Sequence, residues 1–373
     1  MKHLDDGKAL VYSGQGADYH NARQLLQAIK RRYKRKRMAL QETSTDITGL
    51  WMKQKKLQED QSDVVNRLLI QIGLAEGRPS ELLNLNRVPT TSKSVLAYAF
   101  KNDDSVLLDD QQSAMCDSEF LLLSLSDHLA MIGSYEWNRK GIYIHALQDY
   151  IYPHFGVFPP TRQDYISLID HITVDSAAKT YVCMLEVGVG TGVLSMILMK
   201  QNKVHHVQGT DINPYAVACA QDNIRRHGLN DKFTVMQADL FPASTKAKYD
   251  IILFNPPWLP GNAAKHLDDA VYDSPKQDTI RRFLTHAHQY LHPDGQIYLI
   301  MSNLGILLGL YQEDDLHQMV EEGNLEIVKV WYTTFETKKS KRKAEELPIE
   351  SARAKEVISL YQLRVIKPQL IAQ

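Results

Sequence analysis

The spacing of apolar residues changes near residue 150 of the 373-residue chain. Before that point apolar residues recur every three or four positions, as Leu26, Ile29 and Tyr33 do, which is the period of one buried helix face. Such helical runs are expected at 21–60, 64–75, 95–99 and 119–132. We therefore expect residues 1–150 to form a mainly helical accessory domain that is basic near its start.

From about residue 151 onward, short apolar runs alternate with longer amphipathic segments. This alternation predicts a parallel sheet that is joined by right-handed crossovers and covered by helices on both faces. Strands are expected at 182–187, 206–211, 232–237, 249–254, 296–302, 325–333 and 357–365. The helices between them are expected at 192–201, 214–227, 279–291 and 315–323. Because no helix separates the last two strands, we expect that pair to be antiparallel, so residues 151–373 form an α/β domain.

Composition and charge narrow the class of protein. With 43 Lys and Arg against 44 Asp and Glu, the net charge of −1 argues against nucleic-acid binding over the whole surface but not against local basic patches. Cys116, Cys183 and Cys219 are odd in number and widely spaced, which favours a reducing compartment over a disulfide framework or a zinc cluster. The first residues lack the apolar stretch of a signal peptide, and no run reaches the roughly 18 apolar residues of a membrane span. The sequence therefore predicts a soluble, cytoplasmic protein.

A glycine-rich turn follows the first strand of the α/β domain, with Glu186 in the strand and Gly188, Gly190 and Gly192 at alternate positions. Glycines let the backbone turn tightly and let a ligand approach the N-terminus of the next helix. A P-loop is excluded because no Gly-Lys-Ser/Thr sequence follows. The dinucleotide fingerprint Gly-x-Gly-x-x-Gly fits less well, because position 193 is a valine.

Acidic residues end the next two strands. Asp211 lies nineteen residues past Gly192, where a carboxylate can accept hydrogen bonds from both hydroxyls of an adenosine ribose. The third strand ends in Gln-Ala-Asp-Leu at 237–240, from which a side chain could cap an adenine ring. Together with the glycine turn, these residues predict a nucleoside cofactor.

The fourth strand runs directly into Asn255, Pro256, Pro257 and Trp258. The prolines fix the loop and carry no N–H, so the groups that remain are acceptors, the Asn255 amide oxygen and the Pro256 carbonyl, beside a flat ring. These groups suit a planar substrate that bears an NH₂ group. Acceptors on its hydrogens localise the nitrogen lone pair and stabilise the positive charge that develops as the nitrogen attacks a methyl group. Trp258 can stack on such a substrate.

The glycine turn, Asp211 and Asp239 together resemble class I S-adenosylmethionine (SAM)-dependent methyltransferases. The resemblance implies SAM as cofactor and a Rossmann-like seven-stranded sheet whose last strand is antiparallel. The Asn-Pro-Pro-Trp sequence is similar to that of amino-group methyltransferases, which act on exocyclic amines of adenine or guanine or on the glutamine side chain of release factors. The cofactor-binding residues that it implies are Thr161, Arg162, Glu186, Gly188, Gly190, Gly192, Asp211, Ile212, Asp239, Leu240 and Asn255. The catalytic residues that it implies are Asn255, Pro256 and Trp258.

The resemblance covers residues 151–367 and does not extend to the first 150. Segment 156–162 (Gly-Val-Phe-Pro-Pro-Thr-Arg), segment 211–220 and Asn223 resemble the glutamine-modifying group, whereas Trp258 stands where that group usually has tyrosine.

Two basic segments favour a substrate that contains RNA. The first is Lys30 to Arg37, and the second lies between the last two strands, where it should begin at the cofactor-binding edge of the sheet. Its basic residues are Lys338, Lys339, Lys341, Arg342 and Lys343. Such clusters attract phosphates, including those of RNA presented on the ribosome.

The sequence thus predicts a SAM-dependent N-methyltransferase and favours a base amine of RNA over a protein glutamine amide as the acceptor. Two other classes stay open, a SAM-binding protein that does not catalyse and, with a poorer fit, an NAD-dependent oxidoreductase. No metal is expected, because His286 and His288 are two positions apart and point to different faces of a helix.

Overall fold

A computed structural model describes residues 2–13, 16–41, 46–73, 82–85, 88–99, 120–173, 182–261, 270–274, 277–334 and 348–366. The chain divides into two compact units, Met1–Lys140 and Gly141–Gln373. The sequence placed a change of fold near residue 150, ten residues beyond this division. Within the described residues, no helix combines the length and the apolarity needed to cross a bilayer.

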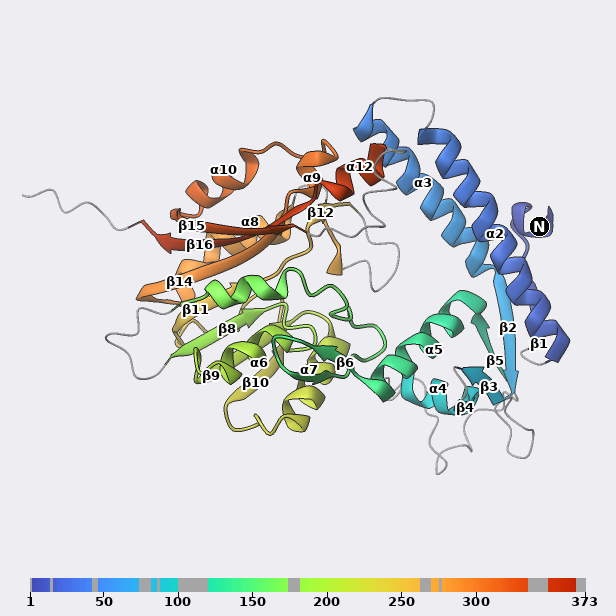
Figure 1. Ribbon diagram of the computed structural model, residues 1–373, viewed down its shortest axis with the longest axis horizontal. Coiled ribbons are helices and arrows are strands. Elements are labelled where there is room, and N and C mark those ends of the chain that lie inside the picture. Colours follow the sequence, from blue (N-terminus) through green and yellow to red (C-terminus); the bar gives the residue numbers. More distant parts are fainter. Residues whose placement is uncertain are drawn as a thin grey trace, which may run out of the picture. The chain divides into compact units, whose positions relative to one another are not determined.

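The first unit contains long helices and a small sheet (Figure 1). Its helices are α1 (Lys2–Asp5), α2 (Gly16–Gln41), α3 (Ile47–Asn66), α4 (Ser92–Ala99) and α5 (Leu125–Lys140). Its strands are β1 (Leu10–Ser13), β2 (Leu68–Gly73), β3 (Leu82–Leu85), β4 (Val88–Thr91) and β5 (Phe120–Ser124). Strand β2 is central, parallel to β1 and antiparallel to β5, while β3 and β4 form a separate antiparallel pair. The expected apolar face of α2 is confirmed, since Leu26, Ile29 and Tyr33 are buried.

Two helical predictions in this unit are wrong. The run 64–75 contains the end of α3 and then strand β2, and the run 119–132 begins with strand β5 before α5 starts at Leu125. Both errors have one cause: Leu68–Ile70 and Phe120–Leu123 are short, continuous apolar runs, and in such runs periodicity cannot separate a strand from a helix.

The second unit is built on a seven-stranded sheet. Its strands are β8 (Cys183–Val187), β9 (His206–Asp211), β10 (Phe233–Gln237), β11 (Tyr249–Phe254), β14 (Leu291–Ser302), β15 (Leu325–Thr334) and β16 (Val357–Val365). They lie in the order β10-β9-β8-β11-β14-β16-β15, and only β16 runs antiparallel to its neighbours. The predicted α/β class, the seven strands and the antiparallel last strand are therefore confirmed.

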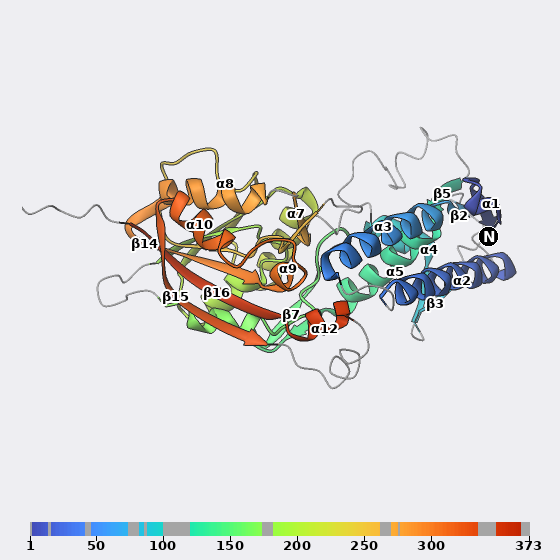
Figure 2. The same ribbon diagram turned by 90° about the horizontal axis from the view of Figure 1, so that it is seen from above.

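Helices cover both faces of this sheet (Figures 1 and 2). The main ones are α6 (Val193–Lys200), α7 (Pro214–Arg226), α8 (Asp278–His286) and α10 (Asp315–Glu322), with the 3₁₀ segment η2 (Ile166–His171). Short elements complete the unit: β6 (Ile142–Ile144), β7 (Asp149–Ile151), β12 (Leu259–Pro260), β13 (Tyr272–Asp273), η4 (Ala287–Tyr290), α9 (Leu304–Leu307) and α12 (Pro348–Ala354).

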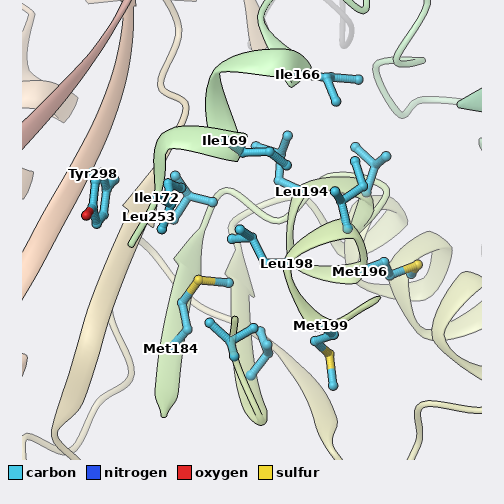
Figure 3. Close-up of a cluster of buried hydrophobic side chains, with 14 of the residues drawn as sticks. Ile166, Ile169, Ile172, Met184, Leu194, Met196, Leu198, Met199, Leu253 and Tyr298 are labelled. Atoms are coloured by element: carbon cyan, nitrogen blue, oxygen red, sulfur yellow. The ribbon is translucent and has the colours of Figure 1, made fainter. Parts of the chain in front are cut away.

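Alternate residues along the strands lie in two hydrophobic layers, one on each face of the sheet. Ile251 and Leu253 of β11 join one layer with α6, α7 and η2, whereas Ile252 and Phe254 join the other with α8 and α10. Figure 3 shows the first layer, in which Ile169 lies beside Leu194 and Leu198 of α6. Because β8 to β11 and β14 are parallel, their C-terminal ends share one edge of the sheet, where the strand order reverses beside β8.

Candidate active site

The glycine turn lies at this edge, between β8 and α6. Gly188, Gly190 and Gly192 have φ angles of 65°, 54° and 80°, the left-handed region that favours glycine, and Gly192 is the N-cap of α6. A Cβ atom added at Gly190 would meet nothing within 4 Å, so the space over this residue is open. The turn therefore presents bare backbone at the start of a helix, as an adenosine-containing ligand requires.

Asp211 at the end of β9 is bonded to this turn. Its Oδ2 accepts the N–H of Gly190 at 2.9 Å, and its Oδ1 accepts the N–H of Asn213 at 2.9 Å. Burial raises the pKa of the Asp211 carboxyl, while the backbone N–H donors of Asn213, Gly190 and Ile212 oppose that rise. Each carboxylate oxygen has two lone pairs, so each can accept one further hydrogen bond, as from a ribose hydroxyl.

The first acidic residue of the motif, Glu186, faces the helix instead. It is buried in β8, where its Oε2 accepts the backbone N–H of Ser195 at 3.3 Å and also the Ser195 hydroxyl. Burial raises the pKa of Glu186 to about 8, although the Ser195 donors favour the ionised form. The structure thus gives Glu186 a role that sequence reasoning missed, since it joins β8 to the first turn of α6. Its contact with a cofactor stays a prediction.

The residues after β9 and β10 differ in exposure. Ile212 is 65% exposed beside Asp211, which suits it to cover a flat ring. Asp239 is about half exposed and pairs with Arg282 of α8 at 2.7 Å. Leu240 is buried, with φ of 66°, and its carbonyl accepts the Thr210 hydroxyl at 2.5 Å. All three belong to the same edge of the sheet as Asp211.

The segment 152–157 is bound to α7 and to the glycine turn through two asparagines. Asn213, the N-cap of α7, donates from Nδ2 to the carbonyl of Gly156 at 3.0 Å. Asn223 is fully buried; its Oδ1 accepts the N–H of Tyr152 at 2.9 Å, and its Nδ2 donates to the carbonyl of Thr191 at 3.2 Å. Asn213 was not predicted, although an asparagine before proline at a helix start is a recognisable capping signal.

Arg162, five residues after this segment, contacts two carboxylates. Its guanidinium donates to Asp164 at 2.5 Å and 3.2 Å and to Glu356 at 3.0 Å, and Glu356 also accepts the Ser302 hydroxyl at 2.6 Å. Desolvation lowers the pKa of Arg162, but these two carboxylates outweigh it and raise the pKa overall, so the guanidinium stays charged. Thr161 beside it is exposed.

Asn255 and Trp258 come together where β11 ends. The Trp258 N–H donates to Asn255 Oδ1 at 3.0 Å and to the carbonyl of Ile300 at 3.1 Å. Tyr165 packs edge-on against the indole with ring centroids 6.0 Å apart, and the Arg162 guanidinium lies 5.9 Å from the indole ring. Burial raises the pKa of Tyr165 to about 12, so it stays neutral. Trp258 therefore fixes the Asn255 amide, a role beyond the predicted stacking.

The strand register brings Asn255 next to the glycine turn. Phe254 of β11 pairs with Val187 of β8, so Asn255 and Gly188 are the next residues of two neighbouring strands. A Cβ atom at Gly188 would lie 3.4 Å from the Phe254 ring. Asn255, Pro256 and Trp258 thus lie beside the turn that sequence reasoning assigned to the cofactor.

Other expectations concern residues away from this edge. Of the three cysteines, Cys183 and Cys219 form no disulfide, and Cys116 lies outside the described residues. The five basic residues at 338–343 also lie outside them. In the part of the chain that the structure covers, no three His, Cys, Asp or Glu side chains are grouped as a metal site.

Comparison with known proteins identifies the family. Residues 150–307 match the family described as "Methyltransferase small domain". A relative from Methanocaldococcus jannaschii, named "Putative protein N5-glutamine methyltransferase", is 35% identical over 156 residues, which cover 40% of this chain and 75% of the relative. A "Release factor glutamine methyltransferase" of Geobacter sulfurreducens is 32% identical, covering 33% of this chain and 45% of the relative.

Relatives with another substrate also match. A "tRNA1(Val) (adenine(37)-N6)-methyltransferase" of Porphyromonas gingivalis is 25% identical, covering 34% of this chain and 52% of the relative. Apart from the archaeal protein, this chain thus spans about half or less of the length of these curated relatives. Among solved structures, a ribosomal protein L11 methylase of Lactobacillus delbrueckii subsp. bulgaricus matches with a TM-score of 0.37 and 16% identity, over 58% of this chain and 86% of that one. The strand order of the sheet and the sequence match together show that the chain belongs to the methyltransferase small domain family, within the class I SAM-dependent methyltransferases.

Proposed function

We propose that this protein methylates a planar amide nitrogen, the side-chain amide of a protein glutamine, with SAM as the methyl donor. The observation that carries the proposal is the fixed Asn255 amide, held by the Trp258 N–H beside the glycine turn. Relatives that are 30–35% identical to this chain support the glutamine amide, since their names specify glutamine as the substrate. The segments 156–162 and 211–220 and Asn223 support it as well.

The cofactor proposed is SAM, and the residues present fit it. The left-handed glycines expose the backbone at the N-terminus of α6, the space over Gly190 is open, and Asp211 offers acceptors at the end of β9. Asp211 would hold the ribose hydroxyls, and the exposed Ile212 would cover the adenine. When bound, SAM would supply an electrophilic methyl group.

The protein's own groups act on the acceptor nitrogen. Asn255 Oδ1, which already accepts the Trp258 N–H, has a second lone pair for an N–H of the substrate, and the Pro256 carbonyl would take the other. These two contacts localise the nitrogen lone pair and stabilise its positive charge as the N–C bond forms and the S–C bond breaks. The proton then leaves the nitrogen to water, so no general base is needed. Holding nitrogen and methyl in line supplies further acceleration.

Transfer of labelled methyl from SAM into a cell extract that lacks this protein tests the proposal. Label should survive nuclease, be released by protease, and appear as volatile methylamine after acid hydrolysis, because hydrolysis of an N-methyl amide frees the amine. The Asn255→Ala variant is the control and should give at least about a hundredfold less label. Label released by nuclease would instead overturn the glutamine assignment.

A second candidate acceptor is the exocyclic amine of an RNA base. The observation that favours it is the basic helix α2, together with relatives named as tRNA adenine-N6 methyltransferases. An adenine amine is also planar, with a delocalised lone pair, so the same Asn255 and Pro256 acceptors would serve it, and Trp258 would stack on the base.

A further inference from the structure

Helix α2 carries a charge unlike that of the rest of the chain. Of its 26 residues, eight are Lys or Arg and one, Asp18, is acidic, whereas the whole chain has a net charge of −1. None of the basic residues lies in the last turn of the helix, where a cation would be stabilised by the helix dipole. The dipole therefore does not account for this cluster.

The structure divides the seven basic residues at 30–37 into two groups. Three have partners within the unit: Arg32 pairs with Asp5 at 2.8 Å, Arg37 donates to Gln61 at 2.7 Å, and Lys36 lies 4.8 Å from the Tyr33 ring. The other four are exposed and make no hydrogen bond or ion pair with any side chain in the described ranges. They are Lys30, Arg31, Lys34 and Arg35, called here the α2 basic face.

The arrangement of charges on the α2 basic face destabilises the helix. Lys30 and Lys34 are four residues apart, as are Arg31 and Arg35, so each pair brings like charges together on the helix surface. A solvated helix normally relieves such repulsion with acidic residues at the same spacing, and α2 has none there. A polyanion bound along this face would relieve the repulsion.

The scarcity of exposed apolar side chains on this face distinguishes among three anionic partners: a membrane, a protein and a nucleic acid. A membrane-bound helix needs an exposed apolar side to insert, but the apolar side of α2 is already buried, with Leu26, Ile29 and Tyr33 in the core. A protein interface needs apolar or aromatic anchors near its centre. The outer face of α2 offers only Met38, which is 42% exposed. A nucleic-acid backbone requires neither feature, because its phosphates are bound by Lys and Arg alone.

We propose that the α2 basic face is a docking surface for RNA and that it binds the phosphate backbone without reading sequence. This goes beyond the methyl transfer itself, and it rests on the proposed function only in the choice of RNA over DNA, since the second candidate acceptor is an RNA base. An RNA that carries the acceptor, or to which the acceptor protein is bound, would thereby reach a higher local concentration at this protein.

Binding of a fluorescein-labelled RNA stem-loop to the full chain, followed by fluorescence anisotropy over a range of salt concentrations, tests this. The variant changes Lys30, Arg31, Lys34 and Arg35 to Gln, which removes charge and keeps good helix formers. The matched control removes the same charge elsewhere by changing four exposed lysines to Gln, namely Lys2, Lys8, Lys232 and Lys246. Melting temperatures establish that both variants are folded.

The α2 variant should bind RNA at least about tenfold more weakly, and the slope of log affinity against log salt should be shallower by about 3, at about 0.7 per phosphate contact. The control should bind within about twofold of the unaltered chain. Equal losses in both variants, or none in the α2 variant, would overturn the proposal. So would polyglutamate that competes as well as the RNA.

The experiment also separates this proposal from the proposed function. Binding is measured without SAM, so it does not depend on catalysis, and Asn255→Ala should bind the RNA like the unaltered chain. If RNA binds through α2 but no methyl transfer occurs, the docking surface holds and the proposed function fails. If glutamine is methylated but the α2 variant binds RNA normally, only the docking surface fails.

Discussion

The two halves of the candidate site are built in different ways. The glycine-loop half, Gly188–Gly192 with Asp211, is held by backbone N–H groups that donate to a carboxylate. The Asn255 half is held by side chains from distant segments, with Trp258 donating to Asn255 and Tyr165 and Arg162 packed around the indole. Single substitutions should therefore separate the two: those in the first half should weaken cofactor binding, and those in the second should slow turnover.

Asn255→Ala should give the largest effect. It removes the acceptor that stabilises the positive nitrogen, and loss of one such preorganised group lowers kcat by about 10²–10³-fold. The affinity for SAM should not change, because Asp211 and the glycine turn are left intact. Single-turnover kinetics and calorimetric titration with SAM measure the two quantities. Parallel losses in both would show that the halves are not independent.

Asp211→Ala tests the other half. Without the carboxylate, two charge-assisted hydrogen bonds to ribose are lost, and SAM should bind about ten- to a hundredfold more weakly, or by about 1.5–3 kcal/mol. Turnover at saturating SAM should stay near that of the unaltered enzyme. The matched control is Asp239→Ala, which removes a half-exposed carboxylate from the same edge and should have less effect. Unchanged SAM affinity in Asp211→Ala would remove the ribose role.

Trp258→Phe tests whether Trp258 acts in the Asn255 half by positioning Asn255 or by stacking on the substrate. The substitution keeps an aromatic ring but removes the N–H that donates to Asn255 and to the Ile300 carbonyl. A freely rotating Asn255 amide should lower kcat about tenfold, the equivalent of one hydrogen bond of about 1.4 kcal/mol, with SAM affinity unchanged. If kcat stays constant while KM for the acceptor rises, Trp258 acts by stacking and does not position Asn255.

The same contrast explains how far the sequence could predict the site. Asp211 and Asn255 lie at the C-terminal ends of β9 and β11, the parallel strands on either side of β8, and such strand ends meet at one edge, so their proximity to the glycine turn follows from the strand pattern. The pairing of Arg162 with Glu356 does not follow from it. These residues are 194 positions apart, and they meet because β16 inserts between β14 and β15, a property of the whole sheet.

The first unit shows a different limit of predicting secondary structure from sequence. The stripe of Leu26, Ile29 and Tyr33 alternates with polar residues, so its helical period is readable from sequence. The apolar runs Leu68–Ile70 of β2 and Phe120–Leu123 of β5 are too short to mark a period, and only their pairing in the sheet makes them strands. Local pattern therefore predicted the long helix better than the short strands.

Glu186→Gln should give the smallest effect on activity and should instead change how stability depends on pH. Burial raises the pKa of Glu186 from 4.5 to about 8 in the folded state. Between those values the folded chain holds a proton that the unfolded chain has released. The free energy of unfolding therefore falls as pH rises, by up to about 1.4 kcal/mol per pH unit, and levels off above the folded pKa.

Glutamine has nearly the same shape, still accepts the Ser195 N–H and hydroxyl, and does not titrate, so the variant should lack this component of the pH dependence. Urea unfolding between pH 5 and pH 8 should show the variant gaining stability relative to the unaltered chain as pH rises. Parallel curves would mean that the buried carboxyl is already ionised at neutral pH. The glycine-loop half would then contain a second buried anion beside Asp211, and burial alone would no longer explain how the two carboxyls differ.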